Sequence, residues 1–187
     1  CNKSAYVIFE RKSLKKVIAH VVQADLTEAK QGVAEGEALA KGVSLTKDLG
    51  NLPPNVCTPS YLAEHAQKMG KQYDFKVKVL ETDDIKKLCM GSFMGVAQGS
   101  HEPPKFIVME YNKGKKNQKP VVLVGKGITF DTGGISLKPG ADMDEMKYDM
   151  CGAGSVLAAL KVAALLKLKL NLVGLVPAVE NMPSDRA

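Results

Sequence analysis

The stretch VGKGITFDTGGISLKPG, residues 124–140, sets two lysines and one aspartate among five glycines, directly after an apolar run. Three kinds of site use such residues: a phosphate-binding loop, a charged turn, and a metal site with a lysine ligand. A phosphate loop requires G-x-x-x-x-G-K-[ST] or G-x-G-x-x-G. Neither lysine has the first spacing, and Phe130 stands at the third glycine position of the second. The phosphate interpretation therefore fails.

A charged turn explains the glycines, because Gly133 and Gly134 supply backbone freedom. It does not explain the density of ionisable groups that follow. Taken singly, most of them fit a solvated face, but Asp149 lies in YDMCGAGSV among apolar and small residues. A buried carboxylate needs a cation or several donors, and a metal shared with Asp131 would supply one. The group consists of Lys126, Asp131, Lys138, Asp142, Asp144, Glu145, Lys147 and Asp149.

Oxygen ligands suit hard or borderline divalent ions such as magnesium, manganese or zinc. A lysine ligand must lose its proton, which costs about 5 kcal/mol at neutral pH. Metal binding offsets a cost of that size. From the residue types and spacing alone, the charged turn and the metal site both stay open.

The elements around this stretch indicate an α/β fold. The apolar run 120–125 predicts a central, parallel strand, so Lys126 and Asp131 fall at a strand's carboxyl end, where open sheets bind ligands. A long helix is expected over 143–168 and a buried strand over 170–179. The predicted class is a mixed, mostly parallel sheet flanked by helices and incomplete at its C-terminal end.

Upstream, a helix over 25–48 is expected to begin at Asp25, with Glu28 in capping-box spacing. Thr58-Pro59 is a typical helix start, with Leu62, Ala66 and Met69 on the buried side. Thr82 is expected to cap a further short helix. Strands are expected over 5–10, 17–22, 75–81 and 105–111.

Composition narrows the function classes. With 187 residues and 45% hydrophobic content the chain can bury a core, and no apolar run reaches the length of about 18 residues that spans a bilayer. Four scattered cysteines without a CxxC pair predict reduced thiols of a cytoplasmic protein. The net charge of +6 admits nucleic acid as a partner, but the basic run 111–120 fits a solvated loop better. The histidines His20, His65 and His101 are expected not to be ligands.

The stretch 124–140, followed by MDEMKYDMCGAGSV, closely resembles the signature of the leucyl aminopeptidase family, the cytosolic two-metal exopeptidases. NLPPNVCTPSYLAEHA, MGSFMGVAQGS and VENMPSDRA resemble further blocks of that family in the same order. The resemblance covers about residues 25–187. It implies a hydrolase that releases N-terminal amino acids, leucine-like ones preferred, from peptides by means of a metal-activated water.

The resemblance also implies roles for particular residues. Lys126, Asp131 and Asp149 match ligands of two divalent ions per subunit, Mn²⁺ or Zn²⁺ with Mg²⁺ as a further option. Asp131 matches the carboxylate that bridges both ions and also contacts substrate. Lys138 matches the catalytic lysine that polarises the scissile carbonyl and so binds substrate as well. Met146 matches a residue of the pocket for the first side chain, and Met143 is expected near it.

The family completes its site with an Asp-x-Glu pair and an arginine in an NTDAEGR block, which this sequence lacks. We therefore expect a catalytic-domain fragment that is inactive alone. The resemblance divides the chain into the tail of an N-terminal domain (1–24), a connecting helix (25–48) and the first part of the catalytic domain (49–187). It implies a cytoplasmic homohexamer. The alternative is a nucleic-acid-binding or assembly subunit without peptidase activity, and a membrane partner is not expected.

Overall fold

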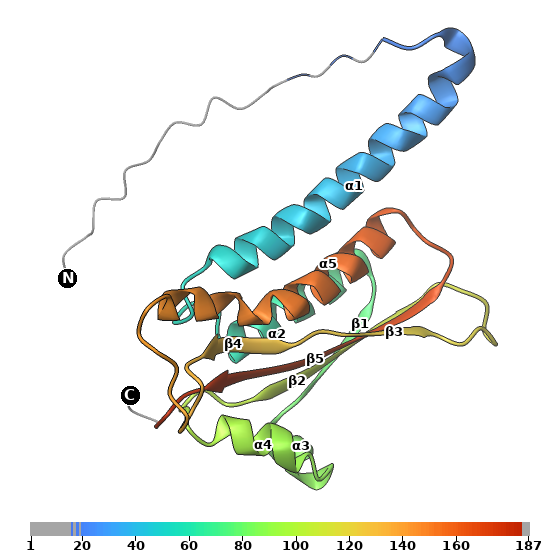
Figure 1. The fold of residues 1–187 in the computed structure, drawn as a ribbon. Helices are drawn as coiled ribbons and strands as arrows, with labels where there is room; N and C mark the ends of the chain where they lie inside the picture. Colours follow the sequence, from blue (N-terminus) through green and yellow to red (C-terminus); the bar gives the residue numbers. More distant parts are fainter. Residues whose placement is uncertain (1–15, 17, 19, 185–187) are drawn as a thin grey trace.

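The computed structural model describes residues 16, 18 and 20–184. Its centre is an open five-stranded sheet in the order β1-β2-β5-β3, with β4 also paired to β5. Helices cover both faces: α1, α2 and α5 lie on one, and α3 and α4 on the other (Figure 1). The strands are β1 (Lys76–Leu80), β2 (Lys105–Asn112), β3 (Val121–Val124), β4 (Gly127–Asp131) and β5 (Asn171–Asn181).

The mixed α/β class is confirmed, but parallel pairing does not predominate. β5 runs parallel to β3 and β4, whereas the pairs β1–β2 and β2–β5 are antiparallel. The expectation failed because apolar strands indicate burial on both faces and carry no information on direction. Ile107 and Met109 of β2 are fully buried, as is Val176 of β5, which lies opposite Ile107, although the two strands run in opposite directions.

The strand predicted over 120–125 is parallel to β5, as expected, but it is not central. Among the described residues β5 is its one strand partner, so β3 forms an edge of the sheet. Val121, Val122 and Val124 are 56%, 51% and 68% exposed. An apolar run predicts a strand that can be covered on both sides; it does not establish that this chain supplies the cover.

The helices largely follow their predicted starts. Thr58 caps α2 by accepting a hydrogen bond from the Tyr61 backbone at 3.2 Å, but Asp25 makes no capping side-chain bond at α1. At α3 the cap is Glu81, in a capping box with Asp84, and not Thr82. The helical elements are η1 (Gln23–Asp25), α1 (Leu26–Asn51), α2 (Pro59–Tyr73), α3 (Thr82–Lys87), α4 (Gly91–Ala97), η2 (Met143–Met150) and α5 (Cys151–Leu165).

The predicted long helix over 143–168 is two elements, because its first eight residues form the 3₁₀ helix η2. Three residues per turn place Met143, Met146 and Asp149 on one face. These three side chains are partly buried, whereas Asp144 and Tyr148 between them are exposed. The 3₁₀ winding therefore turns the predicted ligand and both predicted pocket methionines in the same direction.

The core lies between the sheet and the layer formed by α1, α2 and α5. Leu62 of α2 and Leu157 and Leu160 of α5 are fully buried there. Met143–Leu165 is long and apolar enough to cross a membrane by length and composition, although Asp149 and Lys161 interrupt it and no uninterrupted apolar run in it reaches about 18 residues. In this fold the apolar residues of α5 pack against α1 and the sheet, as in the core helix of a globular domain.

Most of the segment predicted as the tail of an N-terminal domain, 1–24, lies outside the described residues, and so does the strand predicted over 5–10. Residues 18 and 20–22 of the second predicted strand are described and form no strand. α1 is present and extends past α5 (Figure 1). Its role as a connector between domains stays a prediction.

One pH effect follows from the α2 helix. His65 is half-buried and stacks on Tyr61, with ring centroids 6.2 Å apart. Burial, together with the charges of Lys161 and Lys68, lowers the pKa of His65 from its ordinary 6.5. The unfolded chain therefore binds a proton below pH 6.5 that the folded chain resists, and stability should fall as pH drops below that value.

Melting temperatures measured from pH 5 to pH 8 test this effect, with His65→Gln as the comparison. We expect the variant to lose part of the decline that the unsubstituted chain shows on the acidic side. Identical pH profiles for the two proteins would contradict the assignment to His65.

Candidate functional site: two lysine–carboxylate pairs

A break between β3 and β4 positions Lys126. Gly125 still donates to the Leu175 carbonyl at 2.9 Å, but the Lys126 carbonyl turns away to accept from Ala153 of α5 at 2.8 Å. A Cβ atom on Gly125 would lie 2.5 Å from the Gly152 carbonyl oxygen. This close backbone approach requires glycine, and it holds Lys126 against the start of α5.

Lys126 reaches Asp149 at the end of η2. Its Nζ lies 2.7 Å from Oδ1 of Asp149, whereas Oδ2 of Asp149 is buried without any hydrogen-bond partner. An unpaired buried carboxylate oxygen is costly. The Asp149 side chain, 23% exposed overall, thus keeps one oxygen that a cation could satisfy.

Asp131 ends β4 and accepts three hydrogen bonds. The Gly133 backbone N–H and Nδ2 of Asn181 donate to Oδ1 at 3.0 and 2.7 Å, and Nζ of Lys138 donates to Oδ2 at 2.8 Å. Burial raises the pKa of this carboxyl, but the hydrogen bonds and the Lys138 charge together outweigh burial and lower it below the ordinary 3.8. Asp131 is therefore a carboxylate at neutral pH.

The turn after β4 brings Lys138 back to Asp131. Gly133 and Gly134 have φ values of +91° and +67°. Residues with a Cβ atom rarely adopt such values, whereas glycine adopts them readily. Lys138 closes the loop by donating its backbone N–H to the Thr132 carbonyl at 2.8 Å. The glycine pair predicted as a tight turn is confirmed, and its function is to return the lysine to the strand end.

Lys138 also joins this strand end to η2, because its Nζ lies 3.1 Å from the sulfur of Met146. Asp149 is on the same face of η2 and contacts Lys126. The structure thus brings Lys126, Asp131, Lys138, Met146 and Asp149 into one region. Met143 lies on that face too, but its predicted contact with substrate stays a prediction. The expectation that His20, His65 and His101 are not ligands stays a prediction.

Each carboxylate in this region is neutralised by a lysine. Among the described residues there is no group of three or more His, Cys, Asp or Glu side chains arranged to hold a metal ion. The available donors are two carboxylates and one lysine amine. This set suits a hard or borderline divalent ion, and the unpaired Oδ2 of Asp149 fits such an ion as well. The residues present therefore fit part of a metal site.

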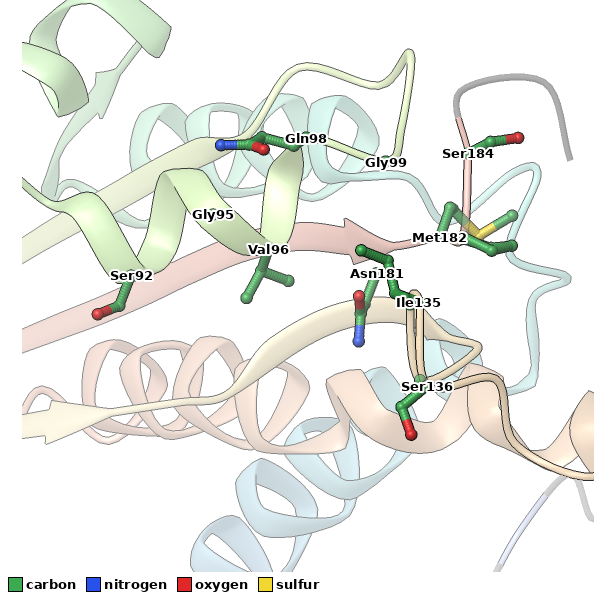
Figure 2. Close-up of a pocket in the computed structure, with 13 residues that line it drawn as sticks. Ser92, Gly95, Val96, Gln98, Gly99, Ile135, Ser136, Asn181, Met182 and Ser184 are labelled. Atoms are coloured by element: carbon green, nitrogen blue, oxygen red, sulfur yellow. The ribbon is translucent and has the colours of Figure 1, made fainter.

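A cleft of about 640 Å³ is lined in part by Gly133 and Asn181, two of the residues that donate to Asp131. Figure 2 shows its lining side chains coming from α4, from the turn after β4 and from the end of β5. Asn181 links the cleft to the site, because it lines the cleft and donates to Asp131. Sequence reasoning did not single out Asn181; its sole signal was membership of the VENMPSDRA block.

Comparisons with known proteins find a matching family model and several relatives. Residues 44–187 match the family model described as "Cytosol aminopeptidase family, catalytic domain". A "Probable cytosol aminopeptidase" of Methylobacillus flagellatus is 61% identical over 178 residues, which cover 95% of this chain and 36% of that protein. The corresponding protein of Azoarcus sp. is 65% identical over 160 residues, covering 86% and 32%.

Two solved structures are also similar. The bottromycin maturation enzyme BotP in complex with Mn has a TM-score of 0.77 at 37% identity, covering 83% of this chain and 33% of that one. The cytosol aminopeptidase from Coxiella burnetii has a TM-score of 0.69 at 35% identity, covering 73% and 29%.

The chain thus spans about a third of the length of the curated relatives named here. The family model nevertheless covers most of it, including every residue of the lysine–carboxylate region. The chain belongs to the cytosol aminopeptidase family.

Proposed function

We propose that this chain contributes the first part of the active site of a metal-dependent aminopeptidase that releases N-terminal amino acids, leucine-like ones preferred, from peptides. The observation that carries the proposal is the unpaired buried Oδ2 of Asp149 beside Lys126. A carboxylate oxygen left without a donor in an otherwise hydrogen-bonded site is suited to a cation. The family supports the same assignment.

Lys126, Asp131 and Asp149 would hold two divalent ions, Mn²⁺ or Zn²⁺ with Mg²⁺ as a further option, together with ligands from outside the described residues. When bound, such ions supply a water of lowered pKa and bind the substrate's α-amine. Lys126 would bind as a neutral amine and so give up its ion pair with Asp149. Asp131 would hold its charge, because its hydrogen bonds favour the carboxylate.

Lys138 would polarise the scissile carbonyl of the substrate. Its ammonium group lies between Asp131 and Met146, so a small movement away from the carboxylate would allow it to donate to the scissile carbonyl oxygen. Stabilising the negative charge that develops there is worth about 3–4 kcal/mol in comparable sites. Met146 and Met143 would line the pocket for the first side chain, since both share the face of η2 that carries Asp149.

We extend the proposal to the domains and assembly. Residues 49–187 would be the first part of the catalytic domain, 25–48 a connecting helix and 1–24 the tail of an N-terminal domain, in a cytoplasmic homohexamer acting on peptides. Several lysines outside the site pair with carboxylates: Lys41–Glu37, Lys68–Glu64, Lys105–Glu81 and Lys113–Asp74. These local pairs leave the net charge of +6 unchanged, so a nucleic-acid-binding or assembly subunit stays the alternative.

A chimera tests this function. Residues 44–187 replace the matching segment of the Methylobacillus relative, and the parent enzyme is the control. We expect hydrolysis of leucyl p-nitroanilide after addition of Mn²⁺ or Zn²⁺, and a loss of at least about 1,000-fold when a chelator removes the metal, because metal catalysis supplies several kcal/mol.

N-acetyl-leucyl p-nitroanilide should be a poor substrate, because it lacks the free α-amine. The 187-residue chain, tested without the rest of the chimera, should show no turnover. A chimera whose activity survives the chelator, while the parent's activity does not, would overturn the proposal; so would cleavage of the blocked and free substrates at equal rates.

A further inference from the structure

Asn181 is the last residue of β5 and lies opposite Asp131 in the parallel pairing with β4. Its side chain donates to Oδ1 of Asp131 at 2.7 Å, and its backbone carbonyl accepts from both the N–H and the hydroxyl of Thr132, at 3.0 and 2.8 Å. Asn181 therefore fixes the end of β4 by hydrogen bonds to Asp131 and to Thr132, the residue after it.

The turn is built to accommodate this amide. A Cβ atom on Gly134 would lie 2.7 Å from Oδ1 of Asn181, so the glycine leaves room for the asparagine side chain. Figure 2 shows Asn181 beside the turn residues Ile135 and Ser136, at the wall of the cleft. The preceding residue is held as well, because Glu180 accepts a hydrogen bond from Ser100.

The hydrogen bonds divide the two oxygens of Asp131 into different roles. Each carboxylate oxygen offers about two lone-pair sites. The Gly133 N–H and the Asn181 amide occupy both sites of Oδ1, whereas Lys138 occupies one site of Oδ2. The remaining site is on Oδ2, the oxygen on the Lys138 and Met146 side, toward η2 and Asp149.

We infer that Asn181 is a positioning residue for the metal centre: with the Gly133 N–H it anchors Oδ1 of Asp131, so that Oδ2 is presented to the ion. This inference rests on the proposed function, since it requires Asp131 to be a metal ligand. A neutral amide suits the task better than a second lysine, because it orients the carboxylate without adding a positive charge that repels the cation. Hydrogen-bond partners of metal ligands typically change metal affinity by 10–100-fold when removed.

The chain offers a matched control at the other end of the same strand. Asn171 begins β5, and its side chain accepts from the Gly114 N–H and donates to the carbonyls of Lys115 and Gln118, at 3.0, 3.0 and 2.9 Å. It anchors a loop remote from Asp131. Asn171→Leu thus removes three side-chain hydrogen bonds from β5, against one for Asn181→Leu, without touching the site.

The experiment is a titration of the metal-free chimera with Mn²⁺, in which the EPR signal of free Mn²⁺ reports binding. Asn181→Leu should weaken Mn²⁺ binding about 10–100-fold. Asn171→Leu should bind like the unsubstituted protein, although both variants lower the melting temperature. Asn181→Ala serves as a second variant if the leucine does not fit beside Gly134, and circular dichroism confirms that each variant is folded.

The outcomes separate this inference from the proposed function. If Asp131→Ala weakens Mn²⁺ binding but neither Asn181 variant does, Asp131 remains a ligand and the role of Asn181 is wrong. If Asn171→Leu weakens binding as much as Asn181→Leu, the effect is one of strand stability and the inference fails. If Asp131→Ala binds Mn²⁺ normally, or the unsubstituted chimera binds none, the proposed metal site itself is overturned.

Discussion

Replacing Asp131 by alanine is expected to reduce kcat/KM for leucyl p-nitroanilide at least about 1,000-fold in the chimera, because a metal centre supplies several kcal/mol of transition-state stabilisation. Asp131 accepts from Lys138, Gly133 and Asn181, so its removal also takes an acceptor away from three donors. Lys126→Ala should have a similar effect, since it removes the amine that contacts Asp149. Steady-state kinetics and the metal content after dialysis measure both effects.

Asp144→Ala is the matched control. This acidic residue lies on η2 with Asp149, but it is exposed, so its loss should leave kcat/KM within about a factor of two, as expected for an exposed surface side chain. If Asp131→Ala and Asp144→Ala reduce activity equally, the general negative charge of the region matters and the specific ligand assignment is wrong.

The second large effect is expected from Gly125→Ala in the 187-residue chain. The added Cβ would lie 2.5 Å from the Gly152 carbonyl oxygen, and a backbone atom at the start of α5 cannot move aside cheaply. Overpacking of this kind costs about 1–3 kcal/mol or more. For a chain of this length that corresponds to a fall in melting temperature of roughly 2–12 °C, which thermal unfolding followed by circular dichroism measures.

Gly36→Ala tests whether the effect is local. Gly36 lies in α1, and a Cβ there would meet nothing within 4 Å. Alanine should therefore raise helix stability by about 0.5–1 kcal/mol. A melting temperature for Gly125→Ala equal to that of Gly36→Ala would show that the strand break tolerates a side chain, and the account of how Lys126 is positioned would need replacement.

Local sequence signals predicted much of the fold. The cap and proline at Thr58-Pro59 start α2 as expected, and Leu62, Ala66 and Met69 are its buried side. These signals act between residues close in the chain. Strand direction and the edge position of β3 depend instead on which segments meet in space. An apolar run such as 120–125 does not specify its strand partners.

The candidate site shows the same division. Lys126, Asp131, Lys138 and Asp149 could be selected from one stretch of sequence, and the structure brings them together in pairs. Asn181 could not be selected, because its contact with Asp131 joins residues 50 positions apart through strand pairing. The lysine–carboxylate pairing itself was also not predicted, since it depends on the turn at Gly133 and on the 3₁₀ winding of η2.

Under the proposed function, the winding of η2 has a consequence for substrate selection. Eight residues at about 2.0 Å per residue extend roughly 16 Å, whereas an α-helix of the same length would extend roughly 12 Å. Met143, Met146 and Asp149 therefore form a nearly straight row along the axis. Exchanging either methionine can reshape the space beside the aspartate without rotating the aspartate, so relatives could diverge in side-chain preference while keeping the same chemistry.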